Sequence, residues 1–308
     1  MTLSASMVKE LREKSGAGMM DCKKALVESN GNMEDAIDWL RKQGLSAIAK
    51  KSSRIAAEGL IGISTNGLQG AIVEINSETD FVARNELFQN FVKKCSNLAL
   101  TNKSDINSLK DLHFPGTDRS VYQELGNNIA TIGENMNIRR VEYLEVSEGI
   151  LVSYIHNKIT EDLGKLGVIV AIETQAKESL LLDVGKQIAM HIAATSPKAI
   201  NIDDLDSDLV NREREVLIDQ AMSSGKPKEI AEKIVQGRLQ KFFQEVVLNE
   251  QISVIDGETK IKDIIKKLSN DLGAEVRIKD YKIFKLGEGI EVAKNNFAAE
   301  VVATADMK

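Results

Sequence analysis

The sequence predicts an α+β protein of several domains, on three observations. Its 308 residues are enough for two or three domains with their own cores. A pattern of two strands followed by an amphipathic helix occurs twice between residues 60 and 195. Residues 203–247 depart from that pattern and are typical of two charge-rich helices.

Residues 1–45 contain three short helical patterns that are separated by glycines. Ser4 can cap the first helix and Asn32 the third, whose apolar stripe we expect to end at Gly44. A bundle of this size has a small core, so its independent stability is marginal. The sequence therefore predicts a three-helix domain at 1–45 and a partly helical linker at 46–59.

The first α+β pattern begins with LIGIST (60–65) and GAIVEIN (70–76). Asn66-Gly67 between them favours a tight hairpin turn. A helix is expected from about 86 to 100, then a helix at 118–132 and a strand at 137–146. One face of the first helix carries the apolar residues Leu87, Phe88, Phe91, Val92, Cys95 and Leu98. We assign residues 60–147 to the first half of the core.

The second pattern repeats the order of the first. Strands are expected at 150–157 and 166–174, followed by helices at 178–195 and 259–272 and a strand within 274–289. The repeat is one of pattern and not of residue identity, which indicates a weak internal duplication. We assign residues 148–199 and 249–285 to the second half of the core.

Residues 200–248 interrupt this second half. The segment predicts two helices joined by SSGKP, with Gly225 ending the first and Pro227 starting the second. Such a hairpin can pack on the core, but its high charge and thin apolar stripe favour an arm that projects toward solvent or a partner. The tail, 286–308, predicts a final helical module.

The bulk composition argues against several classes of protein. The chain has 40 Lys and Arg against 46 Asp and Glu, a net charge of -6, whereas nucleic-acid binders normally carry a basic domain or stripe. No apolar run approaches the length of a membrane span. The N-terminus lacks the apolar region of a signal peptide. We therefore expect a cytoplasmic protein without direct nucleic-acid or membrane contacts.

Motifs for chemistry are missing from the sequence. It contains no GxxxxGK[ST], GxSxG or HExxH motif, and its histidines and cysteines have no metal-binding spacing. His191 lies in an apolar helix, where a hydrogen-bonded core histidine is expected. Glu78 and Asp80 could do acid–base work, but no nucleophile or pocket is evident beside them. We therefore expect a binding protein without cofactor or metal, and not an enzyme.

The stretch SETDFVARN (77–85) places Phe81 in a polar connection between a strand and a helix. From the residues alone, a ring that turns back into the core is the simpler interpretation. The alternative is that Phe81 serves another protein.

A resemblance to a known family decides between these interpretations. Four segments resemble the bacterial elongation factor Ts family: MVKELREKSGAGMMDCKKAL (7–26), SETDFVARN (77–85), IGENMNIRR (132–140) and SGKPKEIAEKIVQGRLQKF (224–242). The resemblance runs along the full length in the same order. It implies a guanine-nucleotide exchange factor in protein biosynthesis that binds elongation factor Tu in its GDP-bound and nucleotide-free forms. In this role it displaces magnesium and GDP and admits GTP.

The resemblance also implies site residues and an architecture. It associates Thr79, Asp80, Phe81 and Val82 with magnesium dislocation from the partner. It implies partner contacts for Met19, Met20, Ile132 and Gly133, although we expect one of the two methionines to be core. In the architecture that the resemblance implies, residues 1–45 are similar to a ubiquitin-associated domain and the core is duplicated. Residues 200–248 resemble a dimerisation insertion, which predicts self-association. The C-terminal helix is expected to be a contact module.

The segment HNKITEDLGKLG (156–167) departs from the family pattern and is expected to be a longer, more acidic turn. Two other functions remain as alternatives. A ubiquitin-associated-type adaptor would dock on another protein without exchange activity, which explains residues 1–45 but leaves the TDFV segment without a role. An enzyme would use Glu78 and Asp80.

Overall fold

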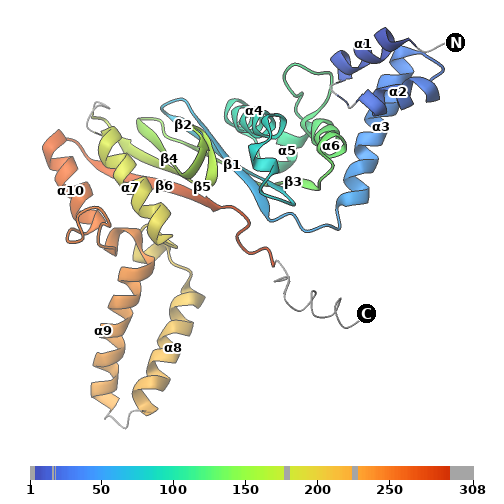
Figure 1. Cartoon of the computed structure of the whole chain (residues 1–308). Coiled ribbons are helices and arrows are strands. Elements are labelled where there is room, and N and C mark those ends of the chain that lie inside the picture. The colour runs from blue at the N-terminus through green and yellow to red at the C-terminus, as the bar shows by residue number, and fades with distance from the viewer. Residues whose placement is uncertain (1–3, 16, 18, 177–180, 224–227, 292–308) are drawn as a thin grey trace.

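The computed structural model describes residues 4–15, 17, 19–176, 181–223 and 228–291. It confirms a mixed α+β protein with three helices at the N-terminus (Figure 1). These are α1 (Ala5–Ser15), α2 (Met19–Glu28) and α3 (Met33–Lys51). Asn32 caps α3 as predicted, because its side-chain oxygen accepts from the backbone N–H of Glu34 at 3.0 Å. The small core of the bundle consists of Leu11, Ala17, Cys22, Ala25, Leu26 and Ala36.

The prediction that the third helix ends at Gly44 is wrong, since α3 continues to Lys51. Gly44 lies where α3 crosses α6 (Val121–Ile132), directly against Gly126. A Cβ atom on Gly126 would lie 2.8 Å from the Gly44 carbonyl oxygen. Gly44 is therefore a packing residue that allows two helices to approach closely, and α3 covers the first part of the predicted linker.

The described strands form one antiparallel sheet in the order β3-β2-β1-β5-β4, with β6 also paired to β5. The Asn66-Gly67 hairpin is confirmed, and Gly67 has φ of +93°, which suits glycine. The strands are β1 (Glu58–Thr65), β2 (Gln69–Ser77), β3 (Met136–Glu145), β4 (Gly149–Thr160), β5 (Leu163–Thr174) and β6 (Val276–Lys285).

The predicted long turn at 156–167 is also wrong, because both strands continue into it and leave only Glu161 and Asp162 between them. The extended tip returns to β1, where Leu163 pairs with Gly62 and Gly164 with Ile61. Leu163 is buried in the core of the first half. The extra residues therefore join the two halves of the sheet.

Two groups of helices cover the two halves of the sheet. The helices α4 (Glu86–Asn102), α5 (Ile106–Asp111) and α6 pack with β1 to β3, and α7 (Leu181–Thr195) and α10 (Ile261–Leu272) pack with β4 to β6. Most of the predicted α4 face is buried, but Leu87 is exposed. A third core, which includes Ile61, Ile72, Leu151 and Ile169, lies where the two halves of the sheet meet.

The helical hairpin predicted at 203–247 is confirmed. Its helices, α8 (Ser207–Ser223) and α9 (Lys228–Val246), extend away from the sheet side by side (Figure 1). They share their own apolar seam, in which Leu217, Val235, Leu239 and Phe243 are buried. Gly225, Pro227 and the helix expected in the tail lie outside the described residues, apart from 286–291.

Candidate partner interface

Phe81 projects from a short loop that leaves the end of β2. The loop closes in a 3₁₀ turn (η1, Val82–Arg84), and Asn85 then caps α4 by accepting from the N–H of Leu87 at 2.9 Å. The Phe81 side chain is 77% exposed, whereas Val82 is 3% exposed and packs in the first core beside Phe88. The interpretation of Phe81 as a core residue is therefore wrong: Val82 anchors the loop and Phe81 faces outward.

The structure separates the four residues of the TDFV segment. Asp80 and Phe81 are exposed, Val82 is buried, and Thr79 is half-buried and hydrogen-bonded. Only Asp80 and Phe81 therefore present most of their side chains to a partner.

The turn after α6 lies beside this loop because β2 and β3 are paired neighbours, with Ser77 opposite Met136. Gly133 ends α6 in the left-handed conformation, with φ of +90°. Glu134 and Asn135 follow it and contact the loop directly, as shown below. Ile132 is half-buried and Gly133 is exposed. Together they directly precede residues that bond to Phe81's loop.

Met19 and Met20 are both exposed, by 56% and 74%. The expectation that one of them is core is wrong, because α2 directs Cys22, Ala25 and Leu26 inward. The N-terminal bundle is joined to the same edge of the sheet, since the Lys51 ammonium at the end of α3 donates to the Gly133 carbonyl oxygen. Met19, Met20, Ile132 and Gly133 thus belong to elements that are connected to one another.

Histidine and cysteine side chains have structural roles. His191 is buried as expected: its Nε2 lies 2.9 Å from Gln251 Oε1, and its Nδ1 accepts from the Val254 N–H at 3.2 Å. Burial lowers the His191 pKa, so the ring is neutral at pH 7. Burial raises the pKa of the Cys22 and Cys95 thiols, which makes them poor nucleophiles.

Within the described ranges, no group of His, Cys, Asp or Glu is arranged to hold a metal ion. Glu78, which the enzyme hypothesis needs as an acid or base, accepts from the Asn135 N–H at 2.5 Å and pairs with Arg54 at 3.4 Å. Its carboxylate therefore holds the loop itself.

Among the residues that the structure describes, no helix combines the length and apolar character that crossing a membrane requires.

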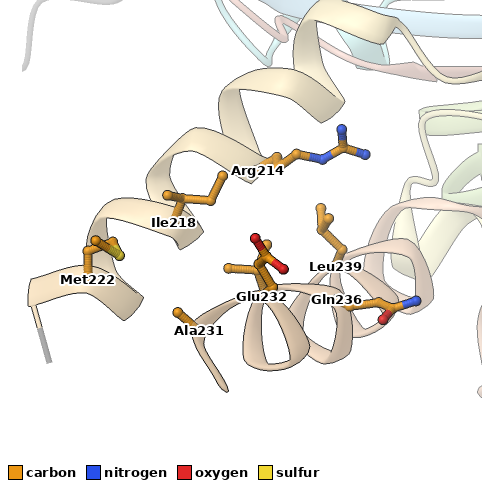
Figure 2. Close-up of a pocket in the computed structure, with 8 residues that line it drawn as sticks. Arg214, Ile218, Met222, Ala231, Glu232, Gln236 and Leu239 are labelled. Atoms are coloured by element: carbon orange, nitrogen blue, oxygen red, sulfur yellow. The ribbon is translucent and has the colours of Figure 1, made fainter. Parts of the chain in front are cut away.

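A second exposed apolar surface lies on the arm formed by α8 and α9. Figure 2 shows Ile218 and Met222 on one helix facing Ala231 and Leu239 on the other across a groove of about 460 Å³. Arg214 and Glu232 place opposite charges on its two walls. The sequence pattern predicted the arm but not this groove.

Sequence reasoning missed Glu134, Asn135 and Lys51, the residues that connect the loop, the turn and α3. The IGEN segment drew attention to Ile132 and Gly133 only. Glu134 and Thr79 are 55 residues apart, so no local spacing could reveal their contact.

Comparisons with known proteins agree along the whole chain. The profile of a protein family described as "Elongation factor TS" matches residues 78–288. The chain is 55% identical over 303 residues to elongation factor Ts of Rhodospirillum centenum, covering 98% of this chain and 99% of that protein. It is 53% identical over 302 residues to elongation factor Ts of Rhodospirillum rubrum, covering 98% of this chain and 98% of that protein. It is 51% identical over 302 residues to elongation factor Ts of Rickettsia bellii, covering 98% of this chain and 97% of that protein.

Proposed function

The chain belongs to the elongation factor Ts family, the nucleotide exchange factors of elongation factor Tu, and we propose that its exchange activity is carried by the loop that presents Phe81. Membership makes elongation factor Tu its partner and protein synthesis in the cytoplasm its setting, and it identifies an exchange factor and not a catalytic enzyme.

Phe81 acts as a wedge against the GTPase. An exposed aromatic ring on an anchored loop is stable in water only at a cost, which a pocket on a partner offsets. When the ring enters between elements beside the nucleotide, the ligands of the magnesium ion move. Magnesium requires near-ideal octahedral coordination, so a small displacement releases the ion and weakens the hold on GDP. The observation that carries this proposal is the contrast between exposed Phe81 and buried Val82.

The wedge needs support from a wider surface. Accelerating GDP release about 10⁴-fold requires about 5.5 kcal/mol of differential interaction. Burying one Phe contributes about 2–3 kcal/mol. We assign the remainder to contacts that prefer the nucleotide-free GTPase, with Met19, Met20, Ile132 and Gly133 as the contributors, because these residues lie on elements joined to the Phe81 loop.

The fold supports most of the domain boundaries that we propose from the sequence. The exceptions are the boundary between residues 45 and 46, which α3 (Met33–Lys51) crosses, and the C-terminal module, of which the structure describes only residues 286–291. Residues 1–45 are the ubiquitin-associated-like domain and 46–59 the linker. Residues 60–147 form the first half of the core, and 148–199 with 249–285 form the second. Residues 200–248 form the arm and 286–308 the C-terminal module. A duplicated core is supported by the identical strand order of the halves, in which β2 and β5 are both central.

The test is release of the fluorescent nucleotide mant-GDP from elongation factor Tu. Substoichiometric protein should accelerate release, since an exchange factor dissociates and acts again. Coupling between ligands is reciprocal, so excess GDP must also weaken binding of the factor to the GTPase. If a complex forms without accelerating GDP release, and if added GDP does not weaken that complex, an adaptor function would be favoured over the wedge.

The arm serves self-association in this proposal. Its apolar groove is open, and Arg214 and Glu232 on opposite walls let the groove of one copy face that of a second in a two-fold arrangement. Met222→Asp should lower the mass measured by light scattering, and replacing 200–248 with a short turn should leave most exchange activity. Loss of exchange in a folded protein without the arm would instead place the arm in the exchange site.

A further inference from the structure

We propose that Glu134 is a positioning residue for nucleotide exchange, because its carboxylate fixes Thr79 and thereby the direction in which Phe81 leaves the surface. This inference rests on the wedge function proposed above for Phe81. It assigns Thr79 an internal role in place of a direct contact with the partner.

Glu134 holds Thr79 with both carboxylate oxygens. Its Oε2 accepts from the Thr79 backbone N–H at 2.9 Å, and its Oε1 accepts from the Thr79 hydroxyl at 2.7 Å. The Thr79 carbonyl oxygen accepts from the Ser77 hydroxyl at 3.0 Å. The amide, the hydroxyl proton and the carbonyl of Thr79 are all engaged inside the protein, two residues before Phe81. Hydrogen bonds to a carboxylate are among the stronger ones in proteins.

A second carboxylate crosses the same gap in the opposite direction. Glu78 of the loop accepts from the N–H of Asn135, and the Asn135 side-chain amide donates to the Arg54 carbonyl oxygen at 2.7 Å. We call the two contacts, Glu134 to Thr79 and Glu78 to Asn135, the clamp. Because Lys51 also donates to Gly133, the turn that carries Glu134 is itself held by α3.

The clamp solves a problem that an exposed aromatic ring creates. A flexible loop would let Phe81 collapse onto its own protein or sample many directions, and binding would then have to order it. Val82 fixes the loop on the C-terminal side of Phe81, and the clamp fixes it on the N-terminal side. With both sides held, the ring is presented in one direction before the partner arrives.

The second half of the sheet contains a natural comparison. There Val276 of β6 pairs with Thr174, as Met136 of β3 pairs with Ser77, so Ala274 stands where the first half has Glu134. Alanine has no carboxylate with which to hold a loop. The carboxylate that holds Thr79 is thus a feature of the first half that the equivalent position of the second half lacks.

The test measures mant-GDP release from elongation factor Tu in the presence of the full-length wild type or one of four full-length variants. Glu134→Ala should slow release about tenfold, whereas Glu134→Gln should stay near the wild-type rate, because its amide can accept from the Thr79 N–H and donate to the hydroxyl. Phe81→Ala should slow release strongly, and adding Glu134→Ala to it should slow release no further. Full non-additivity identifies Glu134 as acting through Phe81.

Three results would overturn the inference. Glu134→Ala could stimulate GDP release from elongation factor Tu at the wild-type rate. Alternatively, added to Phe81→Ala, it could slow release by its full factor, which would give Glu134 a contact of its own. A normal rate in Phe81→Ala alone would remove the wedge, and with it the purpose of the clamp. The first two results leave the wedge intact, so the two failures are distinguishable.

Hydrogen exchange in the free protein gives a reading without the partner. The Thr79 amide should exchange about tenfold faster in Glu134→Ala and at nearly the wild-type rate in Glu134→Gln, while amides of β2 stay protected. Unchanged protection of the Thr79 amide in Glu134→Ala would contradict the clamp.

Discussion

In the first half of the sheet β2 runs between β1 and β3, and in the second half β5 runs between β4 and β6, with all four pairings antiparallel. A register shift interrupts β2 and β3 at Glu74/Ile75, and another interrupts β5 and β6 at Ala171/Ile172. Leu60 faces Ile75 and Ile150 faces Ile172 in the same places. The backbone plan of the two halves therefore agrees at these pairs and register shifts, although the β4–β5 hairpin is longer and carries a further shift between Lys158 and Thr160.

The glycines that precede these pairs agree as well. Gly59 and Gly149 have φ of +129° and +122°, and a Cβ on either would lie about as close to a carbonyl oxygen, 2.2 Å from Ile75 and 2.1 Å from Ile172. Gly70 leaves room for Leu151 of the other half, and Gly167 leaves room for Ile61. The halves pack against each other through equivalent positions.

The differences between the halves lie in the connections and at one position of the central strands, Glu74 of β2 against Ala171 of β5. The first half has Glu134 and the clamped loop with Phe81, whereas the second half has Ala274 at the equivalent position and the arm inserted after α7. Glu74 is buried and binds Arg139, Arg140 and the Gly287 N–H, where the second half has buried Ala171. The two halves thus share one backbone plan and differ most in their connections, which is where binding residues are usually found.

The largest expected effect comes from a comparison of Phe88, in the first turn of α4, with Phe81, in the loop that precedes this helix. Phe88 is fully buried, so Phe88→Ala should lower the free energy of unfolding by about 3–5 kcal/mol in urea denaturation. Phe81→Ala should leave it nearly unchanged, because the ring is exposed in the folded protein. A similar loss of stability in both variants would mean that the Phe81 ring is buried in the core. The exposed loop would then no longer distinguish the first half from the second.

The second-largest expected effect tests whether the two halves are equivalent at Gly59 and Gly149. Gly59→Ala and Gly149→Ala should each destabilise the protein by about 2–3 kcal/mol, because both force alanine into a conformation that glycine alone adopts easily. Thermal and urea unfolding should give the two variants similar values. Gly67→Ala is the control: its φ is also positive, but its Cβ meets no atom within 4 Å, so its cost should be smaller. A tolerated Gly149→Ala beside a damaging Gly59→Ala would break the equivalence.

The smallest expected effect is a dependence of stability on pH that arises from His191 in the second half of the core. Burial lowers the His191 pKa, so the unfolded chain takes up a proton before the folded protein does. Stability should therefore fall as the pH drops below about 6.5, the ordinary pKa of histidine, and level off below the folded pKa. His191→Gln should reduce this slope relative to the wild type. Equal slopes in the two proteins would show that His191 does not cause it.

The sequence predicted those features that depend on local pattern. Asn66-Gly67 located the hairpin, Asn32 located a cap, and the spacing of Phe88, Phe91 and Val92 located a buried face. Gly44 and the 156–167 segment were misread because a packing glycine and a helix stop look alike in sequence, as do an extended hairpin and a polar turn. The exposure of Phe81 followed from the resemblance and not from the residues, and the clamp joins side chains too distant in sequence for any pattern to show.

The measurement that tests the wedge most directly is the magnesium dependence of the Phe81→Ala defect in GDP release from elongation factor Tu. With magnesium present, the variant should release mant-GDP up to about a hundredfold more slowly than the wild type, since up to about 3 kcal/mol of differential interaction is lost. After EDTA removes the ion, part of the wedge's work is already done, so the two rates should converge. A defect of the same size with and without magnesium would contradict the account.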